Sequence, residues 1–329
     1  KAMPVWLREK LFLKQQIAIE LRKLDGDFDV KKLLFSEHHF SHAASAYYPS
    51  PFEDAVVLVM DGVGEWATTT IAIGKGRELN IVKEIHFPHS IGLLYSAFTY
   101  FLGFKVNSGE YKVMGLAPYG EPRFKRIILE NILDLKEDGS FRLDQSYFNY
   151  ATGLTMTNKK FSKLFGEEIR KPESESLTQF HMDIAASVQA VTEEIVLKIT
   201  RFLASEYNIK NLCMAGGVAL NCVANGKILN DKSFENIWIQ PASGDAGGSL
   251  GAALAAWYME LENPRVTSKK DTMKGSYLGP SFTDVEIKHE LDVANANFEV
   301  LPEEDMLECV SQALVEEKTV GWFQGKSEL

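Results

Sequence analysis

Cysteine is scarce in this sequence, with three residues among 329: Cys213, Cys222 and Cys309. None of them belongs to a Cys-x-x-Cys pair, the spacing typical of redox and zinc motifs. Cys213 and Cys222 stand among apolar or small residues, as buried thiols do in proteins of a reducing compartment. We therefore expect a cytoplasmic protein.

Long apolar runs and excess positive charge are missing as well. No run approaches the roughly 18 apolar residues that a membrane span needs, and charges between Lys1 and Lys10 stand where a signal peptide has its apolar core. The net charge of −10 argues against a nucleic-acid partner. With 45% hydrophobic and 24% charged residues, the composition is that of a globular protein long enough for two or three domains. Anionic ligands can still bind locally, through main-chain amides, metals or single basic side chains.

Three of the seven histidines are grouped in the segment Ser36–His42. His38 and His42 are four residues apart, which on a helix places both rings on one face. One divalent metal can then accept a nitrogen from each, at about 2.0–2.1 Å. Val30–Phe35 predicts a strand before the pair and Ala43–Tyr47 a helix after it, so the pair would lie near the carboxyl end of a strand, where α/β folds bind ligands. A solvated or capping histidine cluster is the alternative, because the pair alone lacks a third ligand.

The rest of the chain predicts a mixed sheet covered by helices. Three hairpin-linked strands come first, and alternating helices and strands follow. The expected elements are strands at 55–60, 67–73 and 79–85, helices at 90–103 and 177–207, strands at 212–214 and 237–239, and a small-residue helix that ends near 257. Residues 120–175 are more polar and are typical of an insertion or lid. Residues 275–329 suggest short helices and strands of a separate domain, with a strand at 319–323.

Two glycine-rich turns directly follow predicted strands. In Asp61-Gly62-Val63-Gly64-Glu65, glycines allow main-chain amides to face an anion, and Asp61 can hold a metal or its water. An ordinary hairpin turn explains the same residues. Ala215–Asn221, with Gly216 and Gly217, has the strand–glycine–helix order of a nucleotide site, where a helix amino end favours negative charge. Close packing of a helix on the sheet is the alternative.

A third turn of this kind, Ser243–Gly248, includes Asp245. Asp245 is the best candidate for the oxygen ligand that the two histidines lack, and two imidazoles with one carboxylate suit iron(II) or zinc with positions left open for substrate. A helix-capping role is the alternative. In the glycine-rich segment Gly109–Gly120, Lys112 could meet a phosphate or carbamoyl oxygen, or it is a surface lysine. The other histidines are interpreted as structural: His86, His89, His181 and His289.

Together these motifs make the chain resemble the O-carbamoyltransferases of nodulation and antibiotic biosynthesis. They occur in the family's order and cover about residues 30–260. The matching segments are Glu37–Ala46, Asp61–Glu65, Gly109–Gly120, Gly216–Asn221 and Ser243–Gly248. The family's core is similar to the threonylcarbamoyl-adenosine synthases of tRNA modification and to the hydrogenase-maturation carbamoyltransferase. The resemblance implies an α/β, actin-like ATPase (ribonuclease H-like) core built of two related halves.

The resemblance also implies a reaction and a set of residues. ATP, with Mg²⁺, and carbamoyl phosphate would give carbamoyl-adenylate, and a hydroxyl of a small acceptor would take the carbamoyl group. His38, His42 and Asp245 would hold iron or another divalent metal. Asp61 would contact the metal-bound phosphates or the transferred group, with Lys112 as a second catalytic candidate. The nucleotide would meet the glycine-rich turns, through Gly62, Gly64, Gly216, Gly217, Asn221, Ser243 and Gly244.

Compared with that family, both ends of the chain look cut. Residues 1–53 would be the remnant of the first actin-like half, 54–261 the second half, and 275–329 the start of a carboxyl-terminal domain that stops before the family's Gly-Pro-Arg-Ala-Leu-Gly segment. We therefore expect this chain alone to bind metal and nucleotide weakly and not to form carbamoyl-adenylate. The alternatives are a tRNA threonylcarbamoyl transferase and a non-catalytic, actin-like nucleotide-binding module. The acceptor and the oligomeric state are not legible in the sequence.

Overall fold

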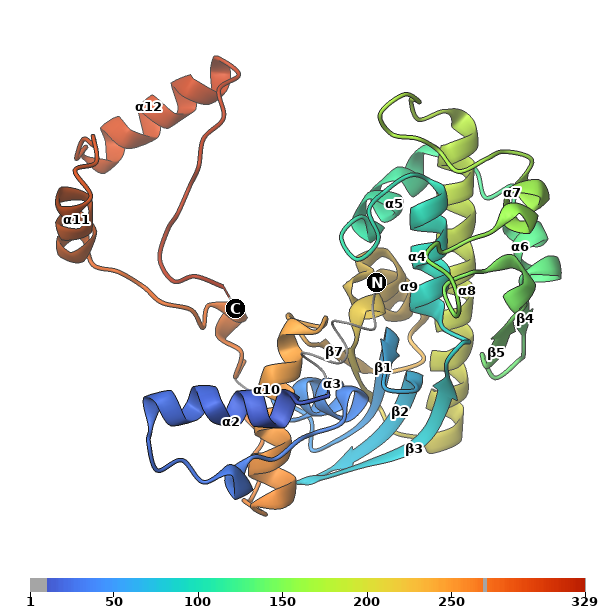
Figure 1. Cartoon of the computed structure of the whole chain (residues 1–329), viewed down its shortest axis with the longest axis horizontal. Coiled ribbons are helices and arrows are strands. Elements are labelled where there is room, and N and C mark those ends of the chain that lie inside the picture. The colour runs from blue at the N-terminus through green and yellow to red at the C-terminus, as the bar shows by residue number, and fades with distance from the viewer. Residues whose placement is uncertain (1–10, 269–270, 329) are drawn as a thin grey trace. The chain divides into compact units, whose positions relative to one another are not determined.

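The computed structural model describes residues 11–268 and 271–328 (Figure 1). Of these, residues 11–267 form one compact unit, and residues 268 and 271–328 belong to a second. The first unit is built on a five-stranded sheet in the order β3-β2-β1-β6-β7. Its strands are β1 (Asp54–Gly64), β2 (Ala67–Lys75), β3 (Glu78–His86), β6 (Asn211–Ala215) and β7 (Asn236–Ile239). The mixed sheet predicted from the sequence is thus confirmed.

The sheet combines a meander with a parallel half. β1 pairs antiparallel with β2, in register Val57↔Ala72, and β2 pairs antiparallel with β3. β1 also pairs parallel with β6, in register Val57↔Cys213, and β6 pairs parallel with β7. The carboxyl ends of β1, β6 and β7 therefore lie at one edge of the sheet. Of the three glycine-rich segments of the sequence, the first forms the end of β1, and the other two follow β6 and β7.

Helices cover both faces of the sheet (Figure 1). Ala55, Val57 and Val59 of β1 are buried in one apolar cluster with the helix α3 (His38–Tyr47), and α10 (Ala246–Ala255) packs on α3. The alternating residues of β1, Val56, Leu58 and Met60, are buried in a second cluster with α4 (Ile91–Phe101) and the long helix α8 (Gln179–Tyr207). β1 is apolar almost throughout because both of its faces are buried.

The helices predicted at 90–103 and 177–207 are confirmed as α4 and α8. The expected strand at 30–35 is wrong: residues Val30–Lys32 form a short 3-10 helix, η2. The Asp29 carboxylate accepts a hydrogen bond from the Lys31 amide and so favours a turn. Before it, α2 spans Leu13–Leu24. The glycine-rich segment after α4 is itself helical, with α5 (Glu110–Leu116) and η3 (Ala117–Tyr119).

Residues 120–175 contribute buried side chains to the core between α4 and α8. Ile128, Phe141 and Phe161 are almost fully buried there. A lid would not supply core residues, so this segment is part of the packed structure. Its elements are α6 (Lys125–Asn131), β4 (Leu133–Leu135), β5 (Phe141–Leu143), η4 (Gln145–Tyr147) and α7 (Lys159–Phe165), and those after β6 are η5 (Gly217–Leu220), α9 (Cys222–Asp231) and the π-helical turn η6 (Ala256–Glu260).

A single arginine holds the carboxyl end of α3. The Arg265 guanidinium donates hydrogen bonds to the carbonyls of Tyr47 at 2.8 Å, Phe52 at 2.8 Å and Ser50 at 3.1 Å. It also lies over the Tyr47 ring, 4.1 Å from the centroid. A cation at this position satisfies carbonyls that a helix end leaves unpaired and complements the helix dipole.

The second unit contains η7 (Lys274–Ser276) and two helices, α11 (Asp284–Val293) and α12 (Glu303–Val315). Neither of these two helices has a buried residue. Thr283 and Glu286 form a capping box at the start of α11. The strand expected at 319–323 is wrong, since no strand occurs among residues 271–328. The predicted boundary between two actin-like halves near residue 53 stays a prediction.

Candidate metal centre and adjoining cavity

The histidine pair lies at the amino end of α3. The helix begins at His38, so His42 lies one turn further on the same face. The two rings are 4.7 Å apart between centroids, and their Nε2 atoms are 3.1 Å apart. His42 is buried, whereas His38 is partly open to solvent. The helical spacing predicted from the sequence is confirmed.

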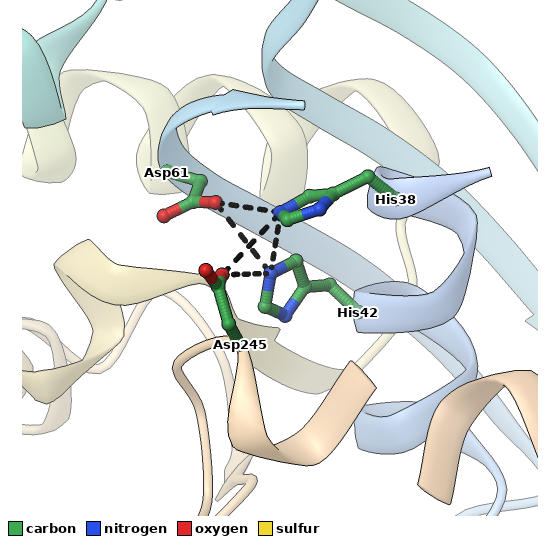
Figure 2. Close-up of side chains that lie close together, drawn as sticks. All are labelled: His38, His42, Asp61 and Asp245. Carbon is green, nitrogen blue, oxygen red and sulfur yellow. Dashed lines mark hydrogen bonds and ion pairs between the residues drawn. The ribbon is translucent and has the colours of Figure 1, made fainter. Parts of the chain in front are cut away.

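Two carboxylates face these rings from separate parts of the chain (Figure 2). Asp61, near the carboxyl end of β1, places Oδ2 2.9 Å from Nε2 of His38 and 3.5 Å from Nε2 of His42. Asp245, at the start of α10, places Oδ1 3.5 and 3.6 Å from the same two nitrogens. Asp245 is 80% exposed and makes no capping hydrogen bond, so its carboxylate is available to a ligand.

The four side chains fit a single divalent cation. Ligand atoms bound at about 2.0–2.1 Å lie about 2.9 Å apart at right angles and about 3.4 Å apart at tetrahedral angles. The five distances given above run from 2.9 to 3.6 Å, and all four ligand atoms lie within 4.8 Å of one another. Two imidazoles and two carboxylates suit iron(II), zinc or manganese. The sequence predicted three of these ligands; for Asp61 it indicated a residue that can hold a metal or its water, and the resemblance implied a contact with metal-bound phosphates or the transferred group.

The β1–β2 hairpin encloses His38. β1 continues through Gly64, so the predicted turn residues Asp61 to Gly64 are strand, and the chain reverses at Glu65 and Trp66. The Glu65 carboxylate accepts a hydrogen bond from the His38 amide at 3.1 Å and so caps α3, since the Glu37 side chain does not. A Cβ on Gly64 would lie 2.4 Å from the His38 ring, so only glycine leaves room for it.

Hydrogen bonds between these side chains shift the pKa values of Asp61 and His38 in opposite directions. Burial would raise the pKa of Asp61, but hydrogen bonds from His38, His42 and the Gly217 amide outweigh it and hold the pKa below its usual range. The hydrogen bond to Asp61 raises the pKa of His38 above 6.5 despite partial burial. Burial lowers the pKa of His39 to about 4, so this neighbour, whose Nδ1 is 2.8 Å from the Thr70 hydroxyl, stays neutral.

We predict that divalent-metal affinity falls as the pH is lowered, and that the fall begins above pH 6.5. A metal binds the neutral imidazole and displaces the proton. Because the pKa of His38 is raised, the proton competes at higher pH than at an ordinary histidine. Below that pKa the affinity should fall about tenfold per pH unit for each proton displaced. Co²⁺ titrations between pH 5.5 and 8.5 measure this, with His86→Ala as the control; a flat profile from pH 8 to 6 would contradict it.

A cavity of about 600 Å³ adjoins the metal group. Asp61 and Asp245 form part of its wall, so a ligand in the cavity can reach a cation held by the four side chains. The remaining wall comes from β1, the start of α4, α5 and the η5–α9 turn. The lining residues are Asp61, Gly62, Val63, Gly92, Leu93, Tyr95, Ser96, Asn107, Ser108, Glu110, Tyr111, Met114, Gly217, Val218, Leu220, Asn221, Gly244 and Asp245.

A buried polar network that sequence reasoning missed supports this wall. Gln189 of α8 accepts hydrogen bonds from the Tyr95 hydroxyl and the Asn221 amide, both at 2.9 Å. Asn221 also caps α9 by accepting from the Ala224 amide at 3.0 Å. Gln189 is 4% exposed. In the sequence it follows the apolar Val188 directly, and a glutamine at that place is the signal that could have indicated the network.

The structure places the predicted nucleotide residues in two groups. Gly62, Gly217, Asn221 and Gly244 line the cavity. Gly64 instead packs on the His38 ring. Gly216 has φ +89° and lies against the Met60 carbonyl, where a Cβ would be only 2.3 Å away, so the close-packing alternative holds for it. Ser243 is buried, and its carbonyl accepts a hydrogen bond from the Gly216 amide at 2.8 Å.

Lys112, predicted as catalytic, does not line the cavity. It is exposed on α5, with its Nζ 5.9 Å from the centroid of the Tyr111 ring. Consecutive residues on a helix face different directions, and here Tyr111 faces the cavity while Lys112 faces solvent. Of the two roles that the sequence left open for Lys112, a surface lysine fits this position better than a contact with a phosphate or carbamoyl oxygen.

Other predictions concern residues away from this centre. Cys213 is buried as expected, but Cys222 is exposed, which makes that expectation wrong. His181 helps to cap α8 by accepting from the Thr178 amide, and His89 accepts from the Leu143 amide, so both have structural partners. Every helix within residues 11–268 and 271–328 is too short or too polar to cross a bilayer.

Comparison with known proteins identifies relatives over almost the whole chain. The family model described as "Carbamoyltransferase N-terminus" matches residues 1–254. The chain is 58% identical to the protein sll1178 of Synechocystis, over 99% of this chain and 54% of that protein. It is 34% identical to the nodulation protein NolNO of Sinorhizobium fredii, over 99% of this chain and 45% of that protein. The chain thus spans about half the length of the curated relatives it matches.

Among solved structures, the crystal structure of T. kodakarensis HypF matches 76% of this chain and 39% of its own. The sequence identity is 16% and the TM-score 0.39. At this level the comparison adds nothing to the fold described above, and the actin-like assignment stays a prediction.

Proposed function

Because the chain belongs to the carbamoyltransferase N-terminus family, we propose that it forms the metal- and nucleotide-binding part of an O-carbamoyltransferase. In the proposed reaction, ATP and carbamoyl phosphate give carbamoyl-adenylate with release of pyrophosphate and phosphate, and a hydroxyl of a small acceptor then takes the carbamoyl group and releases AMP. The relatives are about twice as long as this chain, so the complete reaction is proposed for the full-length protein. The observation that carries the proposal is the convergence of His38, His42, Asp61 and Asp245 beside a cavity large enough for a nucleotide.

A divalent cation held by these four residues would supply a Lewis acid and a template for phosphate oxygens. The protein's own residues fix the arrangement. α3 orients the imidazoles, the hairpin positions His38 and Asp61, and α10 brings Asp245 to the open side. Because hydrogen bonds hold the pKa of Asp61 low, its carboxylate stays ionised at neutral pH and holds Nε2 of His38 in place. Holding reactants in one geometry is a large part of such catalysis.

The rest of the cavity wall suits the uncharged part of a nucleotide. Leu93, Tyr111 and Leu220 offer apolar surface, and Asn221 offers a fixed amide. The Gln189 network positions that amide, so the polar contact is preorganised. The acceptor hydroxyl would approach from the open side, where Asp245 is exposed.

ATP–pyrophosphate exchange on the full-length protein tests the proposal. Water first releases phosphate from carbamoyl phosphate and leaves carbamate. A carbamate oxygen then bonds to the α-phosphorus of ATP and releases pyrophosphate, so labelled pyrophosphate should return to ATP. We expect exchange that requires both carbamoyl phosphate and the bound metal. Exchange without carbamoyl phosphate would contradict the proposal. Nucleotide binding without exchange would favour the non-catalytic module, and transfer to tRNA in place of a small hydroxylated acceptor would favour the threonylcarbamoyl transferase.

A further inference from the structure

Gln189 of α8 joins elements that are far apart in the sequence. It lies one helical turn before Glu193, and it contacts Tyr95 of α4 and Asn221, the residue that caps α9. Of these four residues, Tyr95 and Asn221 line the cavity, whereas Gln189 and Glu193 do not. Because Gln189 is buried, any effect that it has on a ligand in the cavity must pass through a residue of the wall.

Every hydrogen-bonding group of the Gln189 side chain is in use. Its Oε1 accepts from the Tyr95 hydroxyl and from Nδ2 of Asn221, both at 2.9 Å. Its Nε2 donates to Oε1 of Glu193 at 3.0 Å and to Oδ1 of Asn221 at 3.1 Å. A side-chain amide has two acceptor and two donor positions, so Gln189 is fully satisfied by the chain itself.

The Asn221 side chain, by contrast, keeps one N–H free. Its Oδ1 accepts from Gln189 and from the Ala224 amide, the latter at 3.0 Å, and so uses both acceptor positions. One hydrogen of Nδ2 goes to Gln189, and no acceptor among residues 11–268 and 271–328 takes the other. Since Asn221 lines the cavity, this N–H is the hydrogen bond that its side chain can offer to a ligand.

The partners at the ends of the network determine which way both amides point. The Ala224 amide can only donate, so it requires Oδ1 of Asn221 on its side. The Glu193 carboxylate, when ionised, can only accept, so it requires Nε2 of Gln189. Burial raises the pKa of Tyr95, so its hydroxyl stays protonated and donates to Oε1 of Gln189. Turning the Gln189 amide over would place its oxygen against Glu193, acceptor against acceptor, and the observed direction is therefore the stable one.

We propose that Gln189 is a positioning residue and that, through Asn221, it makes the cavity selective for ligands with a hydrogen-bond acceptor at one fixed point. The proposal rests on the proposed nucleotide site and adds the polarity of the ligand atom that this site recognises. A nucleoside offers such acceptors as unprotonated ring nitrogens of the base and as hydroxyl oxygens of the ribose. A ligand with an N–H at the same point would meet a second donor and would be rejected.

Adenosine and five analogues test the proposal in EDTA, where no cation takes part. 1-Deaza-, 3-deaza- and 7-deazaadenosine and 2′-deoxy- and 3′-deoxyadenosine each lack one acceptor that adenosine has. Each is titrated by calorimetry into the chain and into the Gln189→Met variant, whose side chain has a similar length and no amide. We expect the parent chain to bind one analogue about tenfold more weakly than adenosine. In Gln189→Met this ratio should fall below threefold, because Asn221 is no longer held.

Three results would overturn the proposal. Equal binding of adenosine and all five analogues by the parent chain would remove the acceptor requirement and leave the nucleotide site standing. If Gln189→Met weakened adenosine and every analogue by the same factor, the ratio would persist and Gln189 would act through structure alone. Absence of adenosine binding to the parent chain would overturn the nucleotide site and the proposal together.

Glu193 offers a second test that leaves the buried core intact, because this residue is partly exposed. Glu193→Lys places a donor opposite Nε2 of Gln189, so the Gln189 amide loses its direction and the ratio should fall at least threefold. Glu193→Gln is the matched control, since its side-chain oxygen can still accept, and its ratio should stay within twofold of the parent value. Adenosine is uncharged, so the change of charge alone affects the ratio little. An unchanged ratio in Glu193→Lys would contradict the role of Glu193 in orienting the network and overturn that step of the proposal.

Discussion

Replacing His38 by alanine is expected to lower divalent-metal affinity at least 100-fold and to abolish the carbamoyl transfer proposed for the full-length protein. His38 contributes the Nε2 atom that lies closest to the Asp61 carboxylate, at 2.9 Å, and to Nε2 of His42, at 3.1 Å. Removing it leaves three ligands and an empty volume at the centre of the group. Changes one shell further out already cost about 10–100-fold in metal affinity in other proteins, so loss of a direct ligand should cost more.

The measurement is a Co²⁺ titration followed by visible absorption, together with carbamoyl transfer by the full-length variant. His86→Ala is the matched control, since His86 is an exposed histidine whose ring pairs with Glu84. His38→Gln, which keeps a polar side chain of similar length, separates loss of the ligand from loss of volume. If His38→Ala retained both metal and transfer, the ligand assignment would have to be abandoned.

Replacing Gly251 by alanine is expected to destabilise the first unit by about 3 kcal/mol and to reduce metal affinity at least tenfold. Gly251 lies where α10 meets α3, and a Cβ there would be 1.8 Å from the Ser41 carbonyl oxygen. Backbone atoms cannot rotate away, so α10 would have to move from α3. That shift would carry Asp245, at the start of α10, away from the histidines.

Gly248→Ala on the same helix is the matched control. A Cβ at Gly248 would meet nothing within 4 Å, and replacing glycine by alanine within a helix typically stabilises it by about 0.5–1 kcal/mol. Urea unfolding followed by tryptophan fluorescence gives the two free energies, and Co²⁺ titration gives the affinities. Equal stability of the two variants would disprove the close contact between α3 and α10.

Much of the candidate metal centre could be predicted because its signals are local. The spacing of His38 and His42 needs only a helix, and Asp245 follows a strand that ends at the same sheet edge. The role of Asp61 depends on register: β1 runs four residues further than expected, and this extension brings the carboxylate against the rings. A glycine-rich segment looks like a turn in sequence, whereas pairing between Gly64 and Ala67 keeps it extended.

Other predictions failed because a strand depends on partners that its own sequence does not specify. The apolar runs at 30–35 and 319–323 have the composition of strands, but an unpaired strand leaves its amides and carbonyls unsatisfied. At 30–35 the Asp29 side chain offers a turn instead. The catalytic role of Lys112 stays a prediction: its charge suggested a phosphate partner, but the side chain is exposed on α5 and does not line the cavity.

The four residues proposed to bind the cation lie far apart in the sequence, with more than 200 positions between His38 and Asp245. A cation bound to both would act as a crosslink that closes a long loop of the chain and holds α3, β1 and α10 together. Its binding free energy would then add directly to the resistance of this unit to unfolding, by mass action. The ion would therefore stabilise the fold as well as take part in the chemistry. The melting temperature of the unit would then rise with the concentration of free metal.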